Sequence, residues 1–373
     1  MRLSKVIALI SLALAVTTVS AQPEELLGEV AEVANPRLTA GPDGAMHLVY
    51  EGWLGAQGAI AHRIYEEGFW SEEHVLATAP EGLFDPAVAV GTDGTVHVAW
   101  STQSGGEIVH RALREGLWTD ALVIPGGDLG AGEVPQMAAR PDGGAEIVWQ
   151  ALHGSQYHVV HASLEADGSI SGPRTIECQS PGGFNVYPSV FLTPSPVACW
   201  YEAIDGELTL RVAELVPGPQ WRRIPLIDLL QVNLSRLPYI HLGGDGQWVA
   251  LWHDAEPRSD RVLFGRGGPP DFGAPEIVDG NPGMDNVSPS AVELASGRWA
   301  IIWRGESSVG IEIYLALESP DGWSQRLLSA GQTVAPAQPV VCEDGDGLIH
   351  ALWVSDAHAG GTGRLSHIAV APF

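Results

Sequence analysis

Lysine is absent from residues 22–373, because the only lysine of the chain is Lys5. Of the 19 lysines and arginines, Arg2 and Lys5 precede residue 22, and the 17 arginines that remain face 45 aspartates and glutamates. A surface with such an excess of negative charge repels nucleic acid and anionic membranes, and it favours solubility. We therefore expect no nucleic-acid partner.

Cysteine is also scarce, with only Cys178, Cys199 and Cys342 in the whole chain. This count excludes a disulfide-rich scaffold, and the spacing matches no metal site, so we predict neither a metal nor another cofactor. Cys199 and Cys342 stand within apolar strand patterns, where a free cysteine packs as a small hydrophobic residue. We expect all three cysteines in the core, with a Cys178–Cys199 disulfide as the alternative.

Long apolar runs are missing except at residues 6–16. This run follows Arg2 and Lys5, and the small residues Ser20 and Ala21 come shortly after it. The layout is typical of a secretory signal peptide, and the run is too short for a permanent membrane anchor. We predict a signal peptide at 1–21 and one exported domain at 22–373, secreted or periplasmic, without membrane insertion.

A short hairpin recurs along the whole predicted domain, as in "NPRLTAGPDGAMHLVY" (35–50) and "DPAVAVGTDGTVHVAW" (85–100). Its Asp-Gly pair suits a tight turn between two strands. A proline opens the copies at intervals of 49 to 53 residues, at Pro36, Pro86, Pro135, Pro188, Pro238, Pro289 and Pro339. An aromatic residue closes the second strand at Tyr50, Trp100, Trp149, Trp200, Trp252, Trp303 and Trp353.

Each unit continues with a third strand, a turn and a fourth strand, and helical patterns are lacking. Four short strands in a period of about 50 residues indicate a propeller blade. The seventh unit ends after its third strand, at about residues 364–371. The repeat phase places residues 22–27 in the missing position. We predict an all-β, seven-bladed β-propeller with four antiparallel strands per blade, closed by pairing of residues 24–27 with 364–370.

Most of the histidines follow the repeat. His47, His97 and His350 each stand three residues before a closing aromatic residue. Four more share one position of the third strand, namely His62, His110, His161 and His367, and Tyr314 is assigned to that position in the sixth unit. A residue that recurs in several blades serves the fold, since a unique site requires asymmetry. We therefore predict that these histidines are structural.

The repeat, with its degraded aspartate boxes "SPDGW" (319–323), "EEGFW" (66–70) and "REGLW" (114–118), resembles the sialidase-like, BNR-repeat propellers. Sialidases have six blades, so seven blades fit lectins and polysaccharide lyases on related scaffolds better. The resemblance implies a Tyr-Glu catalytic couple, for which Tyr187 and Glu202 are the candidates. It also implies three arginines around a carboxylate, for which the candidates are Arg37, Arg236 and Arg304.

Ligand sites on closed β scaffolds gather in the loops of one face. Here these positions lie beside each proline and just after each closing aromatic residue. The candidates for ligand binding are Arg37, Trp53, Tyr201, Arg236, His253, Asp254, Arg304 and Glu306.

Three functions remain open from the sequence. The first is binding of a glycan on the loop face, with aromatic rings that stack on sugars and charged groups that bind hydroxyls. The second is a sialidase-like glycoside hydrolase or a polysaccharide lyase, and the third is a scaffold for protein partners. We expect a monomer.

Overall fold

The computed structural model describes residues 22–103, 106–126, 129–176, 184–204, 207–217, 220–224, 239–254, 260–267, 273–279, 284–308, 310–330, 336–355 and 363–373. The predicted signal peptide, Cys178 and Arg236 lie outside the described residues. All regular elements described are β-strands, apart from single turns, and no helix in this part of the chain could cross a membrane.

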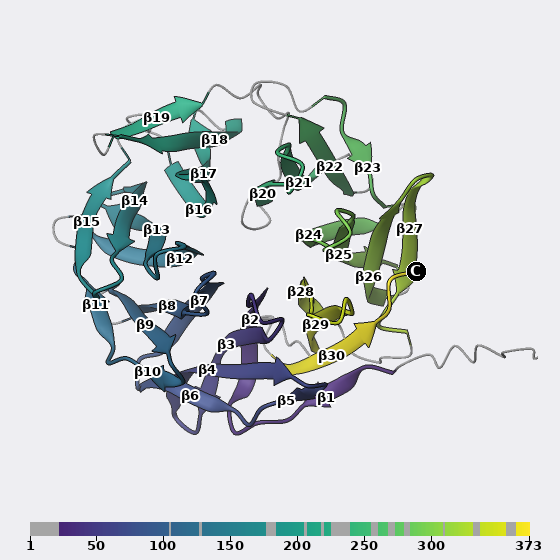
Figure 1. Cartoon of the computed structure of the whole chain (residues 1–373), viewed down its shortest axis with the longest axis horizontal. Coiled ribbons are helices and arrows are strands. Elements are labelled where there is room, and N and C mark those ends of the chain that lie inside the picture. Colours follow the sequence, from purple (N-terminus) through teal and green to yellow (C-terminus); the bar gives the residue numbers. More distant parts are fainter. Residues whose placement is uncertain are drawn as a thin grey trace, which may run out of the picture.

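Seven antiparallel sheets are arranged in a ring, as Figure 1 shows, with their first strands toward the centre. Blade 1 contains β2 (Ala31–Ala40), β3 (Met46–Leu54), β4 (Gln57–Glu66), β5 (Phe69–Trp70) and β6 (His74–Ala79). Blade 2 contains β7 (Leu83–Val90), β8 (Val96–Thr102), β9 (Ile108–Arg114), β10 (Leu117–Trp118) and β11 (Leu122–Ile124). In both, two short strands pair with the third strand at the outer edge.

The other blades have four strands each. Blade 3 contains β12 (Ala131–Ala139), β13 (Ala145–His153), β14 (Gln156–Leu164) and β15 (Ile170–Thr175). Blade 4 contains β16 (Phe184–Thr193), β17 (Ser195–Ile204), β18 (Glu207–Val216) and β19 (Gln220–Ile224). Blade 5 contains β20 (Tyr239–Leu242), β21 (Trp248–Asp254), β22 (Arg261–Gly267) and β23 (Glu276–Ile277). Blade 6 contains β24 (Asp285–Glu293), β25 (Trp299–Ser307), β26 (Gly310–Ser319) and β27 (Gly322–Leu327).

Blade 7 confirms the predicted closure of the ring. It contains β28 (Ala337–Glu343), β29 (Ile349–Ser355) and β30 (Arg364–Val370), and its outer strand is β1 (Glu24–Leu26) from the start of the domain. Glu24 pairs with His367, and Leu26 pairs with Leu365. The seven-bladed fold predicted from the repeat is therefore confirmed.

Deletion of residues 22–27 tests how much this closure stabilises the ring. We expect the free energy of unfolding to fall by about 2–4 kcal/mol, because the deletion removes a short ladder of hydrogen bonds and the packing of Leu26. Urea denaturation gives the value, and removal of the exposed residues 371–373 is the matched control. Equal midpoints for both truncations would contradict a stabilising role for β1.

The core lies between the blades. Five of the closing tryptophans are at most 1% exposed, as is Tyr50, and each packs among aliphatic side chains. Trp149 of blade 3, for example, shares a cluster with Ala87 and Ala99 of blade 2. Cys199 and Cys342 are free, buried thiols in these layers, and burial raises the pKa of each to about 12. The Asp-Gly turns form as expected, because Gly44, for example, has a φ of 83°.

Six of the repeated histidines form buried pairs in blades 1, 2 and 7. His47 Nδ1 lies 3.1 Å from His62 Nε2, and the His97–His110 pair has the same atoms at the same distance. The third pair is His350 with His367, at 2.8 Å. The recurrence of one geometry in three blades supports a structural role. The assignment of Tyr314 to the same position was wrong, because it pairs with Trp303, one residue out of step with the histidines.

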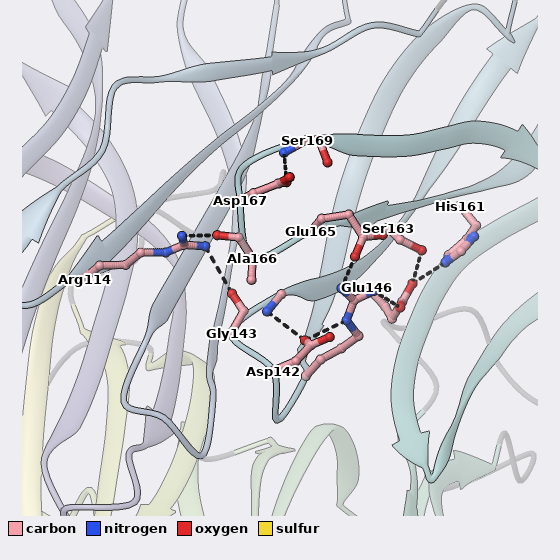
Figure 2. A network of polar contacts seen from close by, with 12 residues as sticks. Arg114, Asp142, Gly143, Glu146, His161, Ser163, Glu165, Ala166, Asp167 and Ser169 are labelled. Atoms are coloured by element: carbon pink, nitrogen blue, oxygen red, sulfur yellow. Dashed lines mark hydrogen bonds and ion pairs between the residues drawn. The ribbon is translucent and has the colours of Figure 1, made fainter.

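Blade 3 replaces the first histidine of the pair by Glu146, which is 2% exposed. Its carboxylate accepts hydrogen bonds from His161 Nε2 and Ser163 Oγ, both at 2.7 Å, and from Arg140 at 3.1 Å. Figure 2 shows this network, in which Arg140 also donates hydrogen bonds to Asp142 and Glu165. Burial raises the pKa of Glu146, but these hydrogen bonds outweigh it and hold the pKa below its usual value.

Candidate functional site

A ring of bulges surrounds the channel. The residue before the repeated proline has a φ between 48° and 56° in six blades, and β7, for example, slips in register against β8 at this point. Such slips define β-bulges. Residues other than glycine rarely adopt a positive φ, and a following proline restricts them further. The six residues are Asn35, Asp85, Val134, Tyr187, Ser288 and Gln338.

Side chains of neighbouring blades hold these strained residues in place. The backbone N–H of Asn35 donates to Gln338 Oε1 of blade 7, at 2.5 Å. The amide of Asp85 donates to Glu51 Oε2 of blade 1, also at 2.5 Å, and that of Tyr187 donates to Gln150 Oε1 of blade 3, at 2.9 Å. Each bond crosses a blade junction, so the bulges link the blades around the channel.

The bulges border a cavity of about 350 Å³ in the channel. Six inner strands contribute to it, and most of their polar side chains come from the residue before the proline or the residue after it. The polar lining consists of Asn35, Arg37, Asp85, Gln136, Tyr187, Ser189, Ser288 and Ser290. This volume is within the range of about 300–1,000 Å³ that is usual for small-molecule sites.

Arg37 is the cationic side chain among the residues that line the cavity. Its Nη1 donates to the carbonyl of Pro36 at 3.2 Å, whereas its Nε has no hydrogen-bond partner in the described structure. Among the described residues, no carboxylate oxygen lies within 4.0 Å of the Arg37 guanidinium. Burial lowers the pKa of Arg37, and the charges of Asp85 and Glu51 oppose this shift. Nε is itself buried, so the donors that a ligand could use are the Nη–H groups not engaged by Pro36.

Two acids balance this charge. Burial, together with the neighbouring Asp85, raises the pKa of Glu51 to about 7. Burial also raises the pKa of Asp85, although Arg37 opposes the shift. Asp85 lines the cavity, whereas Glu51 lies outside its lining, in the small cleft between blades 1 and 2. The cavity thus combines one arginine with one acid.

The predicted catalytic couple occupies two different environments. Tyr187 lines the cavity from the bulge of blade 4. Glu202 is 1% exposed and accepts a hydrogen bond from Arg211 Nε at 2.5 Å. In the ladder Glu202 pairs with Asn185, two residues before Tyr187. The structure therefore places Tyr187 at the channel and Glu202 in a buried ion pair beside it.

The three candidate arginines do not meet in the cavity as far as the structure describes them. Arg37 lines it, whereas Arg304 lies outside its lining and forms an ion pair with Glu306, at 2.7 Å. Arg236 lies outside the described residues. The described residues thus contribute one arginine to the channel.

The remaining candidates are dispersed. Trp53 is half-buried in a small cleft of about 80 Å³ between blades 1 and 2, which Phe84 also lines. Tyr201 is 4% exposed and packs in the core of blade 4, so it offers no open ring face in this structure. His253 and Asp254 end β21, but their side chains lie outside the description.

Sequence reasoning did not assign Asn35, Glu51, Gln136 and Gln150 to the site. Glu51 and Gln150 stand directly after the closing aromatic residue, and Asn35 stands directly before the proline. These are the repeat positions that the sequence already indicated as facing the channel. Comparison of those positions alone, without preference for residue type, could have found them.

No known family profile matches the sequence, and no curated protein matches it. Solved structures do match in fold. A protein of unknown function from Dyadobacter fermentans has a TM-score of 0.56 at 12% identity, over 94% of this chain and 98% of that one. A leech intramolecular trans-sialidase, complexed with 2,7-anhydro-Neu5Ac, has a TM-score of 0.54 at 11% identity, over 95% and 70%. A copper-containing fungal alcohol oxidase has a TM-score of 0.54 at 11% identity, over 94% and 76%. The resemblance to sialidase propellers is thus confirmed at the level of the fold.

Proposed function

We propose that this chain is an exported propeller that binds a glycan in and around the central cavity. The observation that carries the proposal is Arg37, a channel arginine that retains hydrogen-bond donors within a cavity lined by polar groups of six blades. A sugar hydroxyl can donate and accept at once, so it suits a wall that mixes guanidinium, carboxylate, amide and hydroxyl groups.

The charge balance of the cavity favours a neutral sugar over an anionic one. Asp85 lines the cavity together with Arg37, and both Asp85 and Glu51 act on Arg37 electrostatically. A carboxylate ligand would meet one cation and one anion there, whereas a hydroxyl meets donors and acceptors of both kinds. We infer that the preferred ligands are neutral hexoses, pentoses or N-acetylhexosamines.

The solved structures support this proposal only at the level of the fold. The leech trans-sialidase, whose structure contains a sugar derivative, shares the propeller fold with this chain. The fungal alcohol oxidase shares it as well, so the fold by itself does not select a ligand class. The polar lining of the cavity, rather than the fold, is therefore what supports a glycan ligand.

Export is the second part of the proposal and depends on residues 1–21, which lie outside the described structure. Sequencing of the N-terminus after expression with the intact leader tests it. A mature chain that begins at Gln22 and accumulates outside the cytoplasm is expected. An uncleaved Met1 would contradict export by this route.

Replacement of Arg37 by methionine tests the site. We expect the affinity for bound sugars to fall about 10- to 100-fold, because hydrogen bonds to a charged group contribute about 1.5–3 kcal/mol. Titration calorimetry with neutral and acidic glycans, chosen from an array screen, gives the affinities. Arg222→Met is the matched control, since Arg222 is paired with Glu214 on an exposed edge.

Two results would redirect the proposal. Binding that is equal in wild type and Arg37→Met, with both proteins folded, would remove the channel as the site. Turnover of a bound glycan that is lost in Tyr187→Phe would assign a glycosidase or lyase activity instead of simple binding.

A further inference from the structure

The junction between blades 3 and 4 differs from three other junctions at one equivalent position. The position lies at or just before the start of the third strand, three residues before the residue that pairs with the closing aromatic residue. It is occupied by glycine in blades 1, 2 and 7, as Gly58, Gly106 and Gly363, and by residues with a side chain in the other four blades, among them Tyr157 in blade 3.

Backbone contact explains the glycines. A Cβ on Gly58 would lie 2.5 Å from the Cα of Gly82 in blade 2, and a Cβ on Gly106 would lie 2.4 Å from the Cα of Ala131 in blade 3. Gly363 forms a backbone bridge to Val33 of blade 1. These junctions are closed by direct approach of two backbone segments, and at Gly58 and Gly106 they leave no room for a side chain.

Two aromatic rings replace this contact between blades 3 and 4. Phe184 takes the place of Gly82 and Ala131, three residues before the strained residue of the bulge. The rings of Tyr157 and Phe184 have centroids 6.5 Å apart at an interplanar angle of 49°. Phe184 is 47% exposed, so burial in the junction does not account for it.

The pair is held firmly and has polar neighbours. The Tyr157 hydroxyl donates to Glu133 Oε2 at 3.2 Å, and Gln150 Nε2 donates to the same oxygen at 3.1 Å. Asn185, next to Phe184, donates to the carbonyl of Tyr157 at 3.3 Å and accepts from the indole of Trp200 at 2.9 Å. An exposed ring beside a carboxylate and an amide suits a sugar, which presents an apolar face and a rim of hydroxyls.

Hydrogen bonds connect the Tyr157–Phe184 pair with the lining of the cavity. Gln150, which binds Glu133, also accepts the amide of Tyr187, and Tyr187 lines the cavity. Phe184 lies three residues from Tyr187 on the same strand, β16. A ligand that begins in the channel at Tyr187 can therefore extend over the rim of blade 4 to Phe184.

We propose that Tyr157 and Phe184 form a second sugar subsite, so that the ligand is a neutral chain of at least two sugars. The inference depends on the proposed function, since it assigns the first sugar to the cavity at Arg37. Phe184 stacks on the second sugar, and Glu133 binds its hydroxyls. Chain length is then a determinant of affinity.

The test compares sugars of different length on matched variants. Titration calorimetry uses glucose, xylose, mannose, galactose and N-acetylglucosamine, together with their β-1,4-linked di- and trisaccharides. In the wild type we expect the disaccharide of the preferred sugar to bind at least about 5-fold more tightly than the monosaccharide. Phe184→Ala should abolish this gain and leave monosaccharide binding unchanged. Phe69→Ala, at a 77% exposed ring on the outer strand of blade 1, should leave both unchanged.

The possible outcomes separate the two proposals. Arg37→Met should weaken monosaccharides and longer chains by the same factor, whereas Phe184→Ala should weaken the longer chains alone. If the wild type binds a sugar but Phe184→Ala retains the full gain with length, the subsite is refuted and the cavity stands. If none of these sugars binds the folded wild type, the proposed function fails and the subsite fails with it.

Discussion

Replacement of Arg140 by alanine is expected to lower the free energy of unfolding by about 3–4 kcal/mol. Arg140 donates to Glu146, Glu165 and Asp142, and its side chain is 17% exposed. The carboxylate of Glu146 lies in the core beneath it. Loss of the guanidinium leaves the buried carboxylate of Glu146 without its cation. Removal of one partner of a buried ion pair destabilises a protein more than replacement of both partners does.

Chemical denaturation of three variants checks this result. Arg140→Ala/Glu146→Gln should recover about half of the loss, because the amide remains a partner for Ser163 and removes the buried charge. Arg222→Ala breaks an exposed pair and should cost less than about 0.5 kcal/mol. A similar small loss in Arg140→Ala would mean that water replaces the guanidinium at no cost.

Lowering the pH from 7 to 5 is expected to destabilise the propeller through its buried histidine pairs. Burial lowers the pKa of His97 to about 4 and, with the nearby His97, that of His110 to about 3. In the unfolded chain both have a pKa near 6.5. Between pH 6.5 and pH 4 the unfolded chain therefore binds protons that the folded chain does not. Stability is fully present above pH 6.5 and falls as the pH decreases.

The His97–His110 pair should contribute about 3–4 kcal/mol to this loss at pH 5. His97→Phe/His110→Phe should therefore show a shallower decline of stability with pH than the wild type, whatever its stability at pH 7. Thermal and urea unfolding between pH 5 and pH 8 give the two curves. His74→Phe, at an exposed position of β6, is the control. Parallel curves for the double variant and the wild type would contradict the assignment, and so would a selective loss of glycan binding with unchanged stability.

The fold could be predicted from the sequence because the repeated residues each determine local backbone geometry or packing. Proline, Asp-Gly and a closing aromatic residue each have a local geometric role, and their spacing fixed the number of blades. The phase of the repeat also located β1, whose three residues carry no strong strand pattern by themselves. The pairing of Glu24 with His367 bears this out.

The candidate site was harder to predict from the sequence than the fold, for physical reasons. The bulge shifts the strand register at the residue before the proline, so simple alternation of strand residues does not predict which of its neighbours then face the channel. Tyr201 follows a closing tryptophan, as Glu51 follows Tyr50, yet it packs inward in a cluster that includes Ile240 and Ala250 of blade 5. Its place therefore depends on the neighbouring blade as well as on its own strand. Phe184 was missed because its difference from the equivalent residues Gly82 and Ala131 is evident only when the blade junctions are compared in the structure.

The origin of the closing strand sets the order in which the ring can be completed. Glu24 is made among the first residues of the domain, and its partner His367 follows 343 positions later. Until β30 has been synthesised, the chain is an open arc with an unpaired sheet edge at its growing end. Such edges are templates for pairing with other molecules. A chain that stops before residue 364 therefore keeps that unpaired edge, and the pairing of β1 with β30 removes it.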